Sequence, residues 1–147
     1  MDKEFKKYLK LADAYKTLLL ELFDFAYTKN IMPMKFNIFY DKDKINVLFE
    51  ENKITAIQYG IDYFLEFKNE IKNFSLSELK SNENIFILNN IKNDLLKTNN
   101  IYNQQLIDML FGIVNNSKFL NKNDFDIIKE YLLTILLILE KLKILLT

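Results

Sequence analysis

Apolar residues recur every three or four positions along residues 3–29, which is the pattern of an amphipathic helix. Lysine and acidic side chains occupy the opposite side of the same stretch. A second apolar row, Leu11, Leu18 and Phe25, widens the apolar face, so this helix should contact more than one neighbour. The main apolar row consists of Phe5, Tyr8, Leu9, Ala12, Tyr15, Leu19, Leu22, Phe23 and Ala26.

The pattern becomes ambiguous after Pro33, the only proline of the chain, which disfavours helix at the preceding Met32. Apolar and polar residues alternate through residues 36–50, with the polar run DKDK in the middle, as they do in a short β-hairpin. If the alternation is extended to cover residues 36–59, it describes a three-stranded meander. The hairpin is therefore one interpretation of this segment.

A helix is the other interpretation of the same segment. A helix that begins at an Asp43 cap would bring Ile45, Leu48 and Phe49 onto one side. We favour the helix because the flanking segments are helical, and we keep the hairpin as the alternative.

Helical periodicity returns over residues 54–74. Gly60 weakens the continuity of this helix, because glycine costs a helix interior about 1 kcal/mol relative to alanine. The sequence SLSE follows directly, and it has the form of a capping box in which Ser75 is the N-cap and Glu78 lies at the third helical position. A short helix should therefore begin at Ser75.

The last helix, predicted over residues 123–146 with Asn123 as its N-cap, is apolar on almost every side. A helix of this kind is buried, either in a protein core or in lipid. Only a short apolar run separates Glu130 from Glu140, whereas a membrane span needs about 20 mainly apolar residues. We therefore expect a central core helix and no membrane span, with a homo-oligomer or partner interface as the alternative.

Two further helices are predicted over residues 83–98 and 101–114. The whole pattern predicts a mainly all-α fold: one domain, residues 1–147, built as a compact bundle of five to six helices around the apolar C-terminal helix. The possible β-hairpin near residues 36–50 is the one departure from this fold class.

Composition narrows the chemistry that the chain can perform. The chain has no cysteine, histidine, arginine or tryptophan, and its 20 basic residues balance 20 acidic ones. It therefore lacks the commonest zinc ligands and general base, and the mixed charge gives no nucleic-acid footprint. The bias towards lysine, asparagine and isoleucine is typical of an AT-rich genome, bacterial or viral. The N-terminal sequence has no signal-peptide pattern, so we expect a cytoplasmic protein.

The best carboxylate set is the row formed by Asp62, Glu66 and Glu70, spaced four apart in one predicted helix. Such a row could hold Mg²⁺ for hydrolysis of nucleotides or phosphoesters. A charged row opposite an apolar one is ordinarily a solvated face, so we predict no metal site, no catalytic residue and no cofactor.

A candidate partner-binding segment lies around Pro33, where methionines and aromatic residues stand beside acidic ones. Protein contact sites favour such residues, although the same side chains could instead close the end of the bundle. The predicted contact residues are Met32, Met34, Phe36, Phe39, Tyr40, Asp41 and Asp43.

From these observations we expect a small non-enzymatic protein that binds another protein stoichiometrically, as an inhibitor, an immunity protein or a small subunit of a larger complex. A Mg²⁺-dependent hydrolase that uses the Asp62 row is one alternative. A subunit of a nucleic-acid-handling complex is the other.

Overall fold

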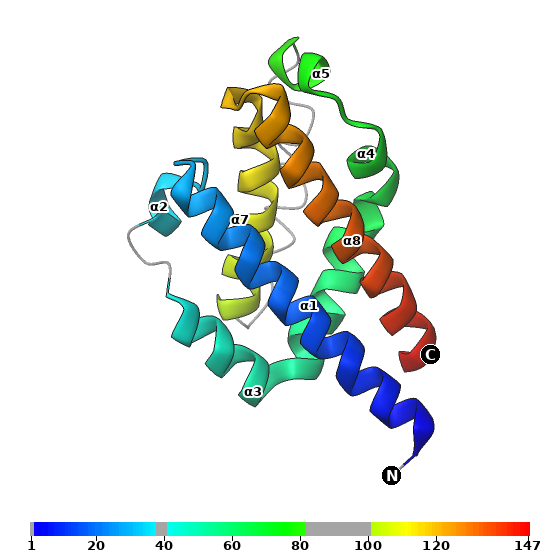
Figure 1. The fold of residues 1–147 in the computed structure, drawn as a ribbon. Helices are drawn as coiled ribbons and strands as arrows, with labels where there is room; N and C mark the ends of the chain where they lie inside the picture. The colour runs from blue at the N-terminus through cyan, green and yellow to red at the C-terminus, as the bar shows by residue number, and fades with distance from the viewer. Residues whose placement is uncertain (1, 38–40, 82–100) are drawn as a thin grey trace.

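The structure, a computed structural model, describes residues 2–37, 41–81 and 101–147, and every regular element in these ranges is a helix (Figure 1). The α-helices are α1 (Lys3–Thr28), α2 (Met34–Asn37), α3 (Lys42–Tyr59), α4 (Lys68–Asn73), α5 (Leu76–Ser81), α7 (Ile101–Asn116) and α8 (Lys122–Leu146). A π-helical segment, η1 (Gly60–Phe64), and two 3₁₀ segments, η2 (Leu65–Phe67) and η3 (Ser117–Phe119), complete them. The predicted all-α bundle is confirmed, while the helix predicted over residues 83–98 lies outside the described ranges.

The long helices α1 and α8 pack against each other and form the frame of the bundle (Figure 1). α1 begins at Asp2, whose carboxylate accepts a hydrogen bond from the Glu4 N–H at 3.3 Å. It ends in a Schellman motif: Asn30 has a φ of 58°, and the Ile31 N–H donates to the Ala26 carbonyl at 2.9 Å. Both ends lie within one or two residues of the predicted boundaries.

α8 contributes one side to the core, which is buried along the helix from Phe125 to Leu142. The predicted central position is confirmed only for this side, because the apolar Leu137 and Ile144 on the other side are 52% and 74% exposed. Its N-cap is Asn121, whose side-chain oxygen accepts from the Asp124 N–H at 2.9 Å, so the predicted cap at Asn123 is wrong by two residues. In the described part of the chain, no helix is long and apolar enough to cross a membrane.

The segment that could have been a β-hairpin is helical wherever the structure describes it. α3 begins at Asp41, which accepts from the Asp43 N–H at 2.9 Å, two residues before the predicted cap. A strand would place Val47 on the same side as Ile45 and Phe49. Instead Val47 is 46% exposed while the other two are buried, which is the outcome of helical spacing. The hairpin alternative is therefore wrong for the described residues 36–37 and 41–50.

The helix predicted over residues 54–74 is present, but its backbone changes type along its length. α3 is kinked at Asn52, where φ is −134° and ψ is 37°. After the kink the chain passes through the π turn that starts at Gly60 and the 3₁₀ turn that starts at Leu65 before it enters α4. The capping position after α4 is as predicted, because the Glu78 N–H donates to the Ser75 hydroxyl at 3.2 Å.

Both glycines of the chain mark places where two segments approach closely. A Cβ atom at Gly60 would lie 2.5 Å from the Tyr15 hydroxyl oxygen of α1 and 3.1 Å from Leu139 of α8. A Cβ atom at Gly112 of α7 would overlap the ring of Pro33. Glycine at these positions allows α1, α8 and the Pro33 turn to pack directly on the helices opposite them.

Candidate partner-binding groove

A groove of about 330 Å³ opens where α2 and the first turns of α3 face α7. Its floor is apolar, and polar and charged side chains of both signs form its rim. The floor residues are Phe36, Ile45, Leu48, Leu106 and Met109. The rim residues are Lys35, Asp41, Lys44, Gln104, Gln105 and Asp108.

The α2 side of the groove is held in place by α7. The Asn116 side-chain amide donates to the Ile31 carbonyl at 2.8 Å, and the Pro33 ring rests against Gly112. The Phe36 N–H donates to the Pro33 carbonyl at 2.8 Å, which closes the turn that carries Phe36 into the floor. Because these contacts fix the backbone of residues 31–36, this side of the groove is formed before any partner binds.

An ion pair crosses the groove between the two walls. The Lys35 ammonium lies 2.6 Å from the Asp108 carboxylate, and the same ammonium lies 4.8 Å from the centre of the Phe36 ring. Both charged side chains are partly exposed, so the pair contributes little stability, typically about 0–1 kcal/mol. Lys44 on the α3 side has no carboxylate partner among the described residues. The rim can therefore offer both signs of charge to a ligand.

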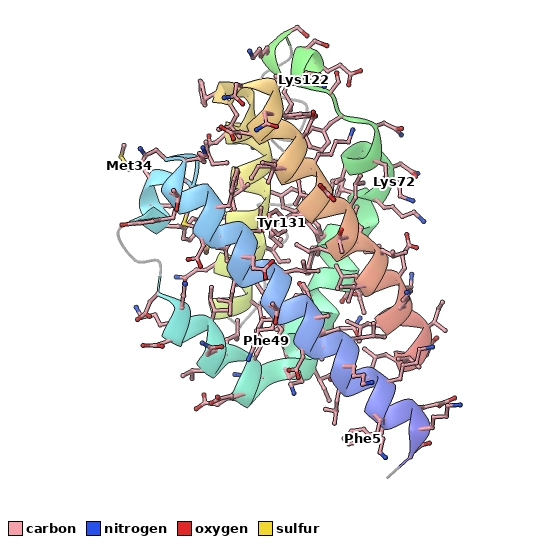
Figure 2. The ribbon with its side chains drawn as sticks, in the orientation of Figure 1. Phe5, Met34, Phe49, Lys72, Lys122 and Tyr131 are labelled. Carbon is pink, nitrogen blue, oxygen red and sulfur yellow. The ribbon has the colours of Figure 1, made fainter. Side chains whose placement is uncertain are left out.

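The predicted contact residues separate into distinct environments. Met32 and Phe36 are buried, at 2% and 8% exposure, whereas Met34 is 81% exposed and points away from the bundle (Figure 2). Asp41 caps α3 and lies on the groove rim, and Asp43 is exposed in the first turn of α3. Phe39 and Tyr40 lie outside the described residues.

Sequence reasoning missed the α7 wall of the groove. Leu106 and Met109 lie on the buried apolar face of α7, but nothing near them in the sequence indicates that they face Phe36. The available signal was the position of Asp108 and Gln105, polar residues beside that apolar face on a helix with few charges. These polar positions can be recognised as the rim of a groove only once it is known that α2 and α3 face α7.

The sequence pattern predicts that Asp62, Glu66 and Glu70 form a row on one side of a regular helix, and the structure contradicts this. Residues four apart share a side only in a regular α-helix of 3.6 residues per turn. Asp62 lies in the π turn, Glu66 in the 3₁₀ turn and Glu70 in α4, so the angle between successive members changes along the row. Asp62 accepts a hydrogen bond from Gln58 at 2.8 Å. Within the described ranges, no group of three or more acidic residues could hold a metal ion.

Comparison of the chain with models of known protein families, with curated proteins and with solved structures found no match.

Proposed function

We propose that the chain acts by stoichiometric binding of another protein, as an inhibitor, an immunity protein or a small subunit, in the cytoplasm. The observation that carries the proposal is the groove between α2–α3 and α7, where an apolar floor is surrounded by a rim of mixed charge. An apolar centre within a polar rim is the usual anatomy of a protein contact site. The exposed Met34 stands on α2, the helix that forms one wall.

The occupant of the groove in this proposal is a partner segment that inserts an apolar side chain between Phe36 and Met109. A volume of about 330 Å³ accommodates one large side chain and its immediate backbone, which is the scale of a single interface anchor. The partner's polar groups would then meet the rim, where Lys44 and Asp41 carry charges of opposite sign. Burial of Phe36 agrees with this role, because a floor must be rigid to define a pocket.

The test blocks the groove without disturbing the core. Gln105 is an exposed rim residue of α7, so Gln105→Trp places a large side chain at the mouth of the groove. The partner is first isolated with the tagged wild-type chain from cells that naturally make it, and its affinity is then measured by calorimetry. We expect Gln105→Trp to weaken binding about ten-fold or more, the effect of losing one good anchor.

Thr55→Trp is the matched control, because Thr55 is exposed on α3 and lies away from the groove lining. Both variants should keep the melting temperature of the wild type, and the control should bind the partner normally. Equal affinity for the two tryptophan variants would show that the contact lies elsewhere, and the lack of any stoichiometric partner would contradict the proposed function itself.

A further inference from the structure

A second groove, of about 540 Å³, lies at the end of the bundle where the α4–α5 connection faces the start of α8. Phe74, in extended backbone after α4, packs edge-on against Phe125 of α8, with ring centroids 5.0 Å apart. Both rings are buried, and together with the half-buried Leu76 they form an apolar floor. This groove shares no lining residue with the groove beside α7.

The walls of this second groove carry an excess of positive charge. Lys80 comes from α5, while Lys122 and Lys129 come from α8, and Lys122 lies at the same end of the molecule as α5 (Figure 2). Among the described residues that line the groove, the one carboxylate belongs to Asp126, which pairs with Lys122 at 3.2 Å. Because the whole chain has equal numbers of basic and acidic residues, the excess is a local property of this groove.

Lys129 is the best-positioned of the three lysines. Its ammonium donates to the Phe74 carbonyl at 2.6 Å and lies 5.0 Å from the centre of the Phe74 ring. A lysine ammonium has three donors, so this hydrogen bond leaves others available. Neither Lys129 nor Lys80 pairs with a carboxylate among the residues that the structure describes. Lys129 is therefore a fixed, half-buried cation that has no counterion within the described ranges.

We propose that this groove binds an acidic segment of a partner protein that also carries an apolar side chain. The partner's carboxylates would pair with Lys129 and Lys80, and its apolar side chain would cover Leu76 and the rings of the floor. Charge complementarity favours this occupant. The apolar floor and the small number of lysines disfavour nucleic acid, which needs a longer row of phosphate contacts.

The proposal is tested with a defined probe, a fluorescein-labelled peptide of glutamates around a central phenylalanine–leucine pair, titrated with the full chain in fluorescence anisotropy. Binding should weaken as salt is raised and should be absent for the same peptide with lysines in place of glutamates. Lys80→Glu, which reverses an exposed charge without removing a contact, should weaken binding about five-fold or more. Lys129→Gln should weaken it as well.

Lys141→Glu is the matched control, because Lys141 is an exposed lysine of α8 outside this groove, and it should bind the probe like the wild type. Equal loss in Lys80→Glu and Lys141→Glu, or equal binding of the two peptides, would overturn the proposal. Displacement of the peptide by inorganic phosphate or by single-stranded DNA at concentrations similar to its own would also overturn it, since a general anion site would then explain the binding. Gln105→Trp should bind the probe normally, so failure of one proposal does not imply failure of the other.

Discussion

The α1–α8 pair and the segment from Lys42 to Asn73 both contribute helices to the bundle but have very different backbones. α1 and α8 run for 26 and 25 residues, and each begins with a side-chain cap. The segment between Lys42 and Asn73 contains a kink, a π turn and a 3₁₀ turn, and η1, η2 and α4 begin without a side-chain cap. In Figure 1 this segment changes direction between α3 and α4, whereas α1 and α8 stay straight.

The difference shows how the spacing of apolar residues determines whether a helix stays regular. In α8 one regular helix can bury Phe125, Ile128, Leu132 and Leu139 on a single side. In the other segment the apolar residues follow two stripes, one through Ile57 and Ile61 and one through Tyr59 and Tyr63. A regular α-helix cannot turn both stripes towards the core along its whole length, and the π turn and the 3₁₀ turn shift the phase where the stripes diverge.

The largest expected effect comes from charging the regular helix on its buried side. Leu136 is 1% exposed and the adjacent Leu137 is 52% exposed. Leu136→Asp buries a charge without a partner, which costs several kcal/mol, against a total stability of about 5–15 kcal/mol for a typical domain. We expect circular dichroism to show an unfolded chain for this variant at room temperature.

Leu137→Asp is the control in the same turn of the helix, and it should leave the melting temperature nearly unchanged. Sedimentation of this variant also examines the homo-oligomer alternative, because Leu137 and Ile144 are exposed apolar residues on one side of α8. A folded Leu136→Asp chain that had lost only an oligomeric state would contradict the assignment of α8 to the core.

An intermediate effect is expected at the π turn. In an ordinary helix, glycine to alanine stabilises the protein by about 0.5–1 kcal/mol. At Gly60 the new Cβ atom would lie 2.5 Å from the Tyr15 hydroxyl oxygen, so Gly60→Ala should instead destabilise the protein, by about 1–3 kcal/mol. Urea denaturation measures the change in the free energy of unfolding.

Tyr15→Phe separates this contact from other effects of the substitution. The Tyr15 hydroxyl is buried and has no hydrogen-bond partner among the described residues, and its burial raises the pKa of Tyr15 above the usual range. Its removal alone should therefore be neutral or stabilising. In the Tyr15→Phe background, Gly60→Ala should cost distinctly less than in the wild type. If Gly60→Ala destabilises the protein equally in both backgrounds, contact with the Tyr15 hydroxyl is not the reason that position 60 requires glycine.

The same comparison explains how far the sequence could predict the fold. The boundaries of α1 and the buried side of α8 followed from periodicity, because a regular helix is a local consequence of its apolar spacing. The π turn at Gly60 did not follow, because Tyr15 and Leu139, against which Gly60 packs, lie far away in sequence. The kink at Asn52 did not follow either. Gly60 itself was the only local sign of the irregularity.

The candidate site was predictable only in part, and for a related reason. Met32 and Met34 have the same side chain and stand on either side of Pro33, yet one is buried and the other is exposed. Their difference arises from the attachment of the turn to Asn116 and Gly112 of α7. The local sequence pattern shows that the segment is unusual. Which of its side chains are buried depends on its contacts with α7, which lies far along the chain.

The smallest expected effect concerns the ion pair that joins the two regions. Lys68 of α4 lies 2.8 Å from the Glu140 carboxylate of α8, and its hydrogen bond is the main reason that the pKa of Glu140 falls below the usual 4.5. Both side chains are partly exposed, so Glu140→Gln should lower the free energy of unfolding at neutral pH by less than about 1 kcal/mol. Urea denaturation at several pH values measures the difference.

The pH dependence distinguishes this ion pair from a loss of packing. Because the pKa of Glu140 is lower in the folded chain than in the unfolded one, its contribution is fully present above about pH 4.5 and disappears as the pH falls through the folded-state pKa. The wild type and Glu140→Gln should therefore converge in stability in acid, and high salt should reduce their difference at neutral pH. Glu130→Gln, at an exposed α8 position without a lysine partner among the described residues, should show no such convergence. If the difference in stability between the wild type and Glu140→Gln stayed constant from neutral pH into acid, the Glu140 side chain would stabilise the protein by packing. The ion pair with Lys68 would then not help to hold the irregular segment against α8.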